Sequence, residues 1–161
     1  MTILGIDPGT AIIGYGVIEE SKIKSQKLKM IDYGCITTTP NFSTAERLAK
    51  LHLELEALIK KHKPDIVAVE DIFFFKNLKT AIKVSQARGV ILLTIAEAKI
   101  KIAEYTPLQI KQAVACYGRA DKNQVQKMVK VLLGLKEIPK PDDAADALAI
   151  AICCANSLKW S

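Results

Sequence analysis

Residues 66–69, Ile-Val-Ala-Val, form a continuous apolar run that follows a proline closely and ends at Glu70. A strand without alternating polar positions has no face for water, so both of its faces must be covered by other elements. Such a strand lies in the middle of a sheet that carries helices on both sides. The run therefore directs the chain toward an α/β fold and places Glu70 at the carboxyl end of a central strand.

The segments around this strand predict a five-stranded mixed sheet flanked by helices. Further strands are expected at residues 2–7, 14–20, 27–38 and 100–105, the first three as an antiparallel meander. Helices are expected from Ser43 to Pro64, from Thr106 onward, and over residues 77–98, 121–133 and 143–158. No repeat or linker interrupts this order, so we expect a single domain covering residues 1–161.

Local signals support the helix boundaries. Ser43 and Glu46 have the spacing of a capping box, and Pro64 stops the helix that they open. Thr106 is expected to cap the next-but-one helix, with Pro107 at its first position. These signals are independent of the hydrophobic periodicity, and they agree with it.

The charge balance permits a polyanionic partner without requiring one. Lysine and arginine total 23 against 17 acidic residues, a net charge of +6. A basic surface of this kind suits nucleic acid. A lysine-rich soluble protein without such a partner has the same balance, so the placement of the acidic residues must decide.

Signals for a compartment or a zinc site are few. No run of 18 apolar residues appears, which predicts no membrane span, and we read no signal peptide at the N-terminus. No cysteine or histidine has a second ligand at zinc spacing, so we expect structural or solvated roles for Cys35, Cys116, Cys153, Cys154, His52 and His62. A reduced, cytoplasmic setting without membrane association fits best.

Four acidic side chains stand at the ends of hydrophobic elements. Asp7 and Glu70 each end an expected central strand, so adjacent parallel strands would place them side by side at one edge of the sheet. Asp143 and Asp146 are three residues apart at the start of the last expected helix, which puts both on one face. The alanines between them leave room for that face to approach the sheet. We therefore expect one cluster of four carboxylates.

Such a cluster indicates a divalent metal site. Gathered carboxylates repel each other and raise one another's pKa, and a bound cation removes that penalty. Oxygen-only ligands favour hard ions, chiefly Mg²⁺, with Mn²⁺ as the usual substitute. Two such ions about 3.5–4 Å apart can activate water and stabilise a leaving oxygen in phosphodiester hydrolysis. The cluster therefore predicts a magnesium-dependent nuclease with two ions per active site.

Each acid also has an ordinary structural explanation. Asp142, Asp143 and Asp146 sit where capping and the helix dipole favour acids, and Asp7 before Pro-Gly can form a turn. Glu70 is harder to explain in this way, because an acid that ends a buried strand needs a partner. Helical spacing from Asp146 favours Asp143 as the third member of the cluster, and for Asp142 we expect capping or simple exposure.

Three consecutive phenylalanines, at residues 73–75, follow Glu70 closely. Successive side chains in an extended segment point opposite ways, so at least one should be exposed. An exposed aromatic beside a nuclease site can stack on an unpaired base, a contact worth roughly 1–3 kcal/mol. A hydrophobic anchor for a loop explains the aromatics equally well. Lys76 and Lys79 follow them and can contact phosphates.

Several motifs together resemble the RuvC family of Holliday junction resolvases. They are ILGIDPGT at 3–10, GYGVI at 14–18, VED at 69–71, FFFKN at 73–77, SQARGV at 85–90, YTPLQIKQAV at 105–114, KNQVQKMV at 122–129 and DDAADALAIAI at 142–152. GIDPGT alone is a weak signal, whereas the whole series in this order is highly specific and covers nearly the full chain. The resemblance implies a ribonuclease H-like fold.

The resemblance also implies roles for particular residues. Its motifs make four acids catalytic and metal-binding: Asp7, Glu70, Asp143 and Asp146. It places Lys111 and Lys122 near the scissile phosphate, although either lysine alone has the pattern of a solvated helix residue. Phe73 matches the aromatic that stacks at the junction centre. Some family members carry histidine at the position of Asp143, which makes this the least rigid element of the site.

The activity implied is the resolution of four-way DNA junctions in homologous recombination and DNA repair. A homodimer with two active sites would nick two strands of like polarity, leaving 5′-phosphate and 3′-hydroxyl ends, beside the RuvA and RuvB branch-migration proteins. A two-fold dimer suits the approximate two-fold symmetry of a junction. The helix expected at 77–98, with small residues Ser85, Ala87 and Gly89, is the candidate dimer contact.

Three other interpretations compete. Sugar kinases and actin-like ATPases also open with a DxGT turn, but they need a second domain to enclose ATP, for which 161 residues leave no space. The shorter YqgF family begins with a similar DPGT turn, and the FFFKN and SQARGV segments speak against it. A junction-binding module without catalysis is disfavoured because all four acids are present.

Overall fold

The computed structural model of the protein describes residues 1–20, 27–39, 41–71 and 78–158. Its strands are β1 (Thr2–Asp7), β2 (Ile12–Glu20), β3 (Leu28–Thr37), β4 (Ile66–Glu70) and β5 (Lys101–Tyr105). Its helices are α1 (Thr44–His62), α2 (Leu78–Glu97), α3 (Pro107–Ala115), α4 (Lys122–Leu132) and α5 (Asp142–Leu158). The strands form one sheet in the order β3-β2-β1-β4-β5. Because β1–β2 and β2–β3 are antiparallel while β1–β4 and β4–β5 are parallel, the expected five-stranded mixed sheet is confirmed.

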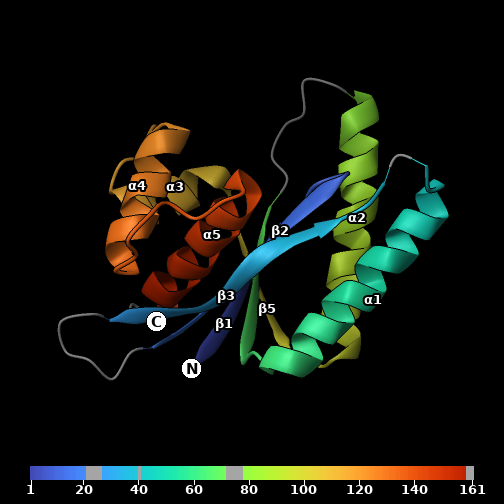
Figure 1. Ribbon diagram of the computed structural model, residues 1–161, viewed down its shortest axis with the longest axis horizontal. Helices are drawn as coiled ribbons and strands as arrows, with labels where there is room; N and C mark the ends of the chain where they lie inside the picture. Colours follow the sequence, from blue (N-terminus) through green and yellow to red (C-terminus); the bar gives the residue numbers. More distant parts are fainter. Residues whose placement is uncertain (21–26, 40, 72–77, 159–161) are drawn as a thin grey trace.

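Helices cover both faces of the sheet (Figure 1). The helices α1 and α2 lie on one face, and α3, α4 and α5 lie on the other. Val67 and Val69 of β4 belong to the core cluster on the α1 and α2 side, whereas Ile66 and Ala68 belong to the cluster on the α5 side. All four side chains are buried. The apolar run that indicated a doubly covered central strand is therefore central and covered on both faces.

Two elements begin earlier than the sequence indicated. β2 begins at Ile12 instead of residue 14, because β3 continues far enough for Thr37 to pair with Ile12. The N–H of Thr38 extends that ladder by donating to the carbonyl of Ala11 at 2.9 Å. α5 begins at Asp142, one residue before the expected start. Both differences fall within the uncertainty of element boundaries.

The expected capping signals are present. The hydroxyl of Ser43 accepts the N–H of Glu46 at 3.3 Å, and the Glu46 carboxylate accepts the N–H of Ser43 at 2.7 Å. Thr106 caps α3, whose first residue is Pro107. These bonds satisfy backbone donors that the first helical turn leaves open. The starts of α1 and α3 are thus determined locally.

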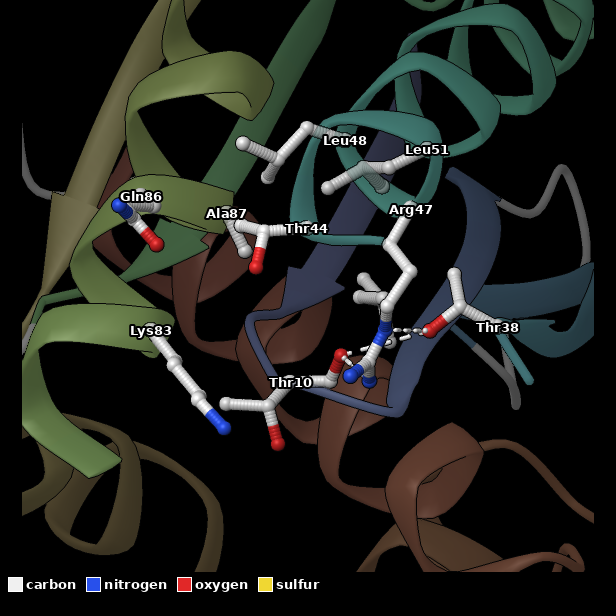
Figure 2. Close-up of a pocket in the computed structure, with 10 residues that line it drawn as sticks. Thr10, Thr38, Thr44, Arg47, Leu48, Leu51, Lys83, Gln86 and Ala87 are labelled. Carbon is white, nitrogen blue, oxygen red and sulfur yellow. Dashed lines mark hydrogen bonds between the residues drawn. The ribbon is translucent and has the colours of Figure 1, made fainter. Parts of the chain in front are cut away.

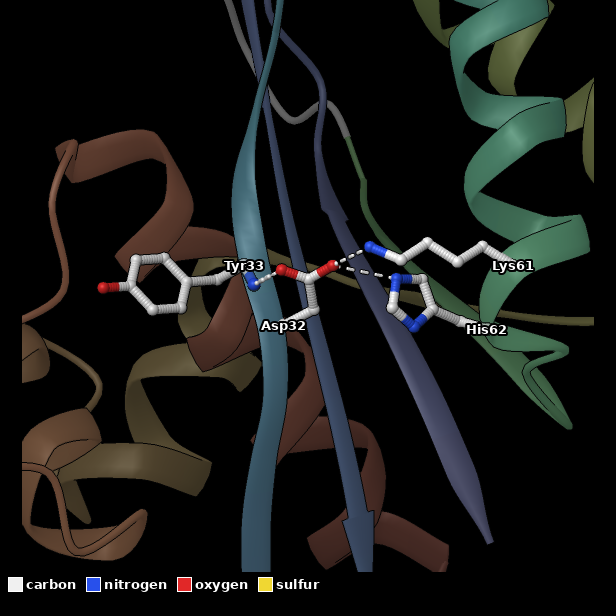
Figure 3. Close-up of polar contacts among 4 residues, drawn as sticks. All are labelled: Asp32, Tyr33, Lys61 and His62. Atoms are coloured by element: carbon white, nitrogen blue, oxygen red, sulfur yellow. Dashed lines mark hydrogen bonds and ion pairs between the residues drawn. The ribbon is translucent and has the colours of Figure 1, made fainter.

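The two histidines hold α1 in place. Asp32 of β3 accepts a hydrogen bond from Lys61 at 2.8 Å, and its Oδ2 atom lies 3.0 Å from His62 Nε2 (Figure 3). His52 Nδ1 lies 2.9 Å from the Thr94 hydroxyl, which links α1 to α2. The structural role expected for His52 and His62 is confirmed.

The helix α5 is embedded against the sheet. Eleven of its residues are buried, which leaves it without a solvent-facing side along most of its length. Glycines beneath it permit the close approach: a Cβ on Gly5 would lie 2.1 Å from the Ala147 carbonyl oxygen, and one on Gly14 would lie 2.0 Å from the Asp143 carbonyl oxygen. Both distances are far inside van der Waals contact. The position of α5 therefore depends on these glycines.

Candidate active site

The sheet brings Asp7 and Glu70 together. β1 and β4 are parallel neighbours, and Ile6 lies opposite Val69 in their register. Asp7 and Glu70 are the next residue on each strand, so both carboxylates leave the sheet at the same edge. This adjacency is the arrangement expected from the sequence.

The first turn of α5 brings two further acids to that edge. Asp7 is paired across the sheet with Gly14 of β2, and the backbone carbonyl of Asp143 lies directly over Gly14. Asp143 is thereby held next to Asp7. Asp146 lies one turn further along α5 and lines a pocket with Glu70. The missing side chain of Gly14 is thus what allows the N-terminal turn of α5 to reach the strand acids.

The electrostatics of the four acids are coupled. Burial raises the pKa of Asp7 from its usual 3.8 to about 8, with further increases from the negative charges of Glu70, Asp146 and Asp143. Burial, followed by the charge of Asp146, raises the pKa of Glu70 from 4.5 to about 7, and Lys111 opposes this shift. Gathered carboxylates out of water behave in this way unless positive charge compensates them.

Two lysines supply part of that positive charge. Lys111 of α3 and Lys122 of α4 line the same pocket as Glu70 and Asp146. Lys122 Nζ lies 2.9 Å from Asp146 Oδ2, and Lys111 lowers the pKa of Glu70. Both lysines therefore lie beside the acids, although the Lys122 side chain is also 55% exposed.

Asp142 has a different environment from Asp143. Its carboxylate accepts a hydrogen bond from Lys140 at 2.8 Å, and its side chain is 46% exposed. Asp143 is among the charges that act on Asp7, and Asp142 is not. The geometry therefore brings Asp143 to Asp7 and leaves Asp142 at the rim, where its Oδ2 atom also lies 3.8 Å from Lys122 Nζ.

The donor set fits a hard divalent cation. Its candidate ligands are carboxylate oxygens, and the raised pKa values of Asp7 and Glu70 reflect negative charge that such an ion would neutralise. Within the described ranges, no three carboxylate, histidine or cysteine side chains are gathered closely enough to surround a metal ion as they stand. Lys122 instead occupies one oxygen of Asp146.

Two expected DNA contacts, Phe73 and Lys76, lie outside the described residues. Asp71, the last described residue after β4, donates its N–H to the Tyr105 carbonyl at 2.8 Å. The salt bridges that Arg88 forms beside the end of β4 were not expected from the sequence. Arg88 of α2 pairs with Asp71 at 3.1 Å and also with Glu104 of β5. It connects α2 to the ends of both strands beside the site.

Comparisons with known proteins identify the family of this chain. Residues 3–154 match the family profile described as crossover junction endodeoxyribonuclease RuvC. The chain belongs to the RuvC family. A RuvC from Halothermothrix orenii is 58% identical over 159 residues, covering 99% of this chain and 94% of that protein. A RuvC from Desulfitobacterium hafniense is 60% identical over 158 residues, covering 98% and 94%.

Solved RuvC structures share the fold. The Thermus thermophilus RuvC structure superimposes with a TM-score of 0.91 at 36% identity, covering 99% of this chain and 96% of that one. A second structure, of T. thermophilus RuvC in complex with a Holliday junction substrate, has a TM-score of 0.90 at 34% identity, covering 100% and 97%. The expected ribonuclease H-like fold is confirmed. RuvC nucleases are metal-dependent as a family. In the described part of this chain, no helix is long and apolar enough to cross a membrane.

The metal-free protein is expected to lose stability as the pH rises from about 4 to about 8. Because the pKa of Asp7 is near 8 in the folded state and near 3.8 when unfolded, the folded chain binds a proton that the unfolded chain releases across this range. The stabilisation is complete below the unfolded value and lost as the pH passes the folded one. Melting temperatures measured in EDTA between pH 4 and 9 test this.

Asp7→Asn is the matched variant for this titration, because it keeps the size of the side chain and removes its proton equilibrium. The difference in melting temperature between the native protein and the variant should change with pH in that window. Parallel curves for the two proteins would show that Asp7 has an ordinary pKa.

Proposed function

We propose that this protein is a metal-dependent endonuclease that resolves four-way DNA junctions by paired, symmetric nicks. The observation that carries the proposal is the convergence of Asp7, Glu70 and Asp146 with two lysines at the carboxyl edge of β1 and β4. A relative of the same fold, from T. thermophilus, has been solved with a Holliday junction substrate. The activity would serve homologous recombination and DNA repair in the cytoplasm, within a single domain over residues 1–161.

The residues divide the chemistry among them. Asp7, Glu70, Asp143 and Asp146 would hold two Mg²⁺ ions, or Mn²⁺ as a substitute. Bound metal would supply an activated water and stabilise the departing 3′-oxygen. Lys111 and Lys122 face the same pocket, where their charges would hold the scissile phosphate and offset the negative charge that develops on it. Phe73 and Lys76 remain proposed contacts to the junction bases and backbone.

The test is cleavage of a synthetic four-way junction whose arms cannot migrate. With Mg²⁺ we expect nicks at symmetric positions on two opposing strands, with ends that DNA ligase seals directly. Linear duplexes of the same sequence should be cut far more slowly. Products with 3′-phosphate ends, or equal cutting of linear duplex, would contradict the proposed reaction.

Paired nicks require two active sites, and we propose that α2 forms the contact of a homodimer. Its outward face carries Ile82 and Leu93, which are 53% and 58% exposed. Gly89 lies between them, and a Cβ at this position would have no side chain and no other described element within 4 Å beyond its own chain neighbours, so a second backbone can approach. Of the three small residues noted from the sequence, Ala87 is buried in the core, whereas Ser85 and Gly89 are exposed.

Leu93→Asp is expected to convert the dimer into monomers, because two buried charges would face each other across a two-fold contact. Analytical ultracentrifugation checks the mass. Val131→Asp is the matched control, since Val131 is 67% exposed on α4, on the opposite face of the sheet. The monomeric variant should release singly nicked junctions. An unchanged mass would exclude this face as the contact.

RuvA and RuvB, the branch-migration proteins implied by the family, remain the proposed protein partners.

The net charge of +6 is compatible with a DNA partner over a broad surface. Junction binding should therefore weaken as salt rises, because each phosphate contact releases counterions.

A further inference from the structure

A basic pocket lies on the side of the sheet opposite α5, between the N-terminal halves of α1 and α2 (Figure 2). Two cations line it, Arg47 of α1 and Lys83 of α2, with Thr10 between them in the view. The remaining lining residues are neutral: Ile13, Thr38, Thr44, Leu48, Leu51, Gln86 and Ala87. The pocket therefore has positive charge and hydroxyl groups but no lining carboxylate.

Arg47 is fixed in this pocket by neutral oxygens. Its Nε–H donates to the Thr38 hydroxyl at 2.8 Å, and its Nη2 donates to the backbone carbonyl of Thr10. The neighbouring carboxylate of Glu46 is engaged with the Ser43 backbone. A guanidinium held in this way keeps its full charge and its remaining N–H groups for another acceptor.

Lys83 is exposed, and in the described part of the chain neither it nor Arg47 forms an ion pair. Other lysines of the same helical layer are paired, such as Lys50 with Glu54 and Lys60 with Glu56. Among the described residues, no acidic side chain therefore neutralises either of the two cations that line this pocket. A small anionic group with several acceptor oxygens is the ligand that matches them.

The pocket borders the candidate active site across the edge of the sheet. Thr10, whose carbonyl binds Arg47, lies three residues after Asp7 in the turn that follows β1. A DNA strand carries one phosphate per roughly 3.4 Å of helix axis. A strand or arm that presents one phosphate to the carboxylates therefore has further phosphates within reach of the opposite face.

We propose that Arg47 and Lys83 bind a backbone phosphate of the junction DNA, away from the cleaved bond, on the α1 and α2 side of the sheet. The proposal rests on the proposed function for its substrate. The contact positions DNA without reading sequence, as phosphate contacts do. Because Arg47 also bonds the turn after Asp7, it links this phosphate to the backbone that carries a catalytic acid.

The decisive measurement is the salt dependence of junction binding by Lys83→Gln, made in the Asp7→Asn background so that nothing is cut. Losing one phosphate contact should reduce the slope of log K against log salt by about 0.9. Between 50 and 200 mM salt this makes the loss of affinity about 3.5-fold smaller than in the parent protein. Lys83 is exposed, so its loss should leave the fold intact, which an unchanged melting temperature would verify.

Lys60→Gln is the matched control, because Lys60 lies at the other end of α1 and its removal changes the net charge equally. Its slope should equal that of the parent. A methylphosphonate scan of the junction strands then locates the contact: one neutralised phosphate should weaken binding to the parent but not to Lys83→Gln.

An unchanged slope for Lys83→Gln overturns the proposal. The slope would also be unchanged if these cations bound an acidic protein surface instead of DNA. This outcome is separable from failure of the proposed function. A native protein that cuts junctions while Lys83→Gln binds like its parent would refute only the phosphate site. A native protein that cuts no junction while the variant lowers the slope would refute only the nuclease.

Discussion

Asp7→Asn is expected to abolish cleavage of a four-way junction while leaving junction binding intact. Burial and the charges of three neighbouring acids raise the pKa of Asp7 to about 8, and asparagine keeps the shape of its side chain but not its charge. Outer-shell partners of metal ligands contribute about 10–100-fold, so loss of a ligand itself should slow cleavage about a thousandfold or more. DNA binding should persist, because the Asp7 carboxylate repels the DNA phosphates and its removal takes away no attraction. Single-turnover cleavage and fluorescence anisotropy measure the two properties separately.

Asp142→Asn is the matched control for this experiment. It makes the same chemical change at an acid on the rim of the site, which pairs with Lys140 at 2.8 Å and lies 3.8 Å from Lys122. We expect near-normal cleavage from Asp142→Asn and strong loss from Asp143→Asn. The reverse order would assign the third acid to Asp142, and normal cleavage by Asp7→Asn would remove Asp7 from the active site.

Gly14→Ala is expected to lower the free energy of unfolding strongly, unlike Gly89→Ala, which adds the same methyl group. A Cβ on Gly14 would lie 2.0 Å from the carbonyl oxygen and 2.4 Å from the carbonyl carbon of Asp143. Both are backbone atoms, so no side-chain rotation relieves the clash and the start of α5 must move. Overpacking usually destabilises by about 1–3 kcal/mol, and a backbone clash belongs at or above the upper end. Urea unfolding in EDTA measures the effect.

Gly89→Ala is the matched control, because it adds the same methyl group where no side chain and no other described element lies within 4 Å beyond its own chain neighbours. In the Leu93→Asp background, where dimer contact is removed, alanine should stabilise the helix by about 0.5–1 kcal/mol. Gly14→Ala should also slow cleavage, since Asp143 moves with α5. Wild-type stability in Gly14→Ala would mean that α5 does not depend on this close approach.

The sheet and its strand acids were predictable because their signals are local. Residues 66–69 lack any polar position, and a strand of this kind has one location in an α/β fold. Asp143 was favoured over Asp142 because the register of the DDAADALAIAI motif was added to the helical spacing, since both residues lie within one turn of Asp146. The adjacent positions of Asp7 and Glu70 then followed from where parallel strands end.

Other features depend on contacts between distant segments, and no local pattern reveals them. Gly5 and Gly14 look like ordinary strand glycines until α5 is placed over them. Arg88 meets Asp71 and Glu104 only after α2 packs beside β4 and β5. Lys83 and Arg47 are separated by a whole strand and two helix segments, so their shared pocket exists only in the folded chain.

The burial of α5 against β1 has a consequence for how the protein is made. The candidate acids occupy positions 7, 70, 143 and 146, so the first and last of them are synthesised 139 residues apart. At typical translation speeds, roughly 7 to 28 seconds separate their appearance at the ribosome. Until α5 emerges and docks, a nascent chain has Asp7 and Glu70 but lacks the other two acids. A chain still under synthesis should therefore be unable to cut DNA.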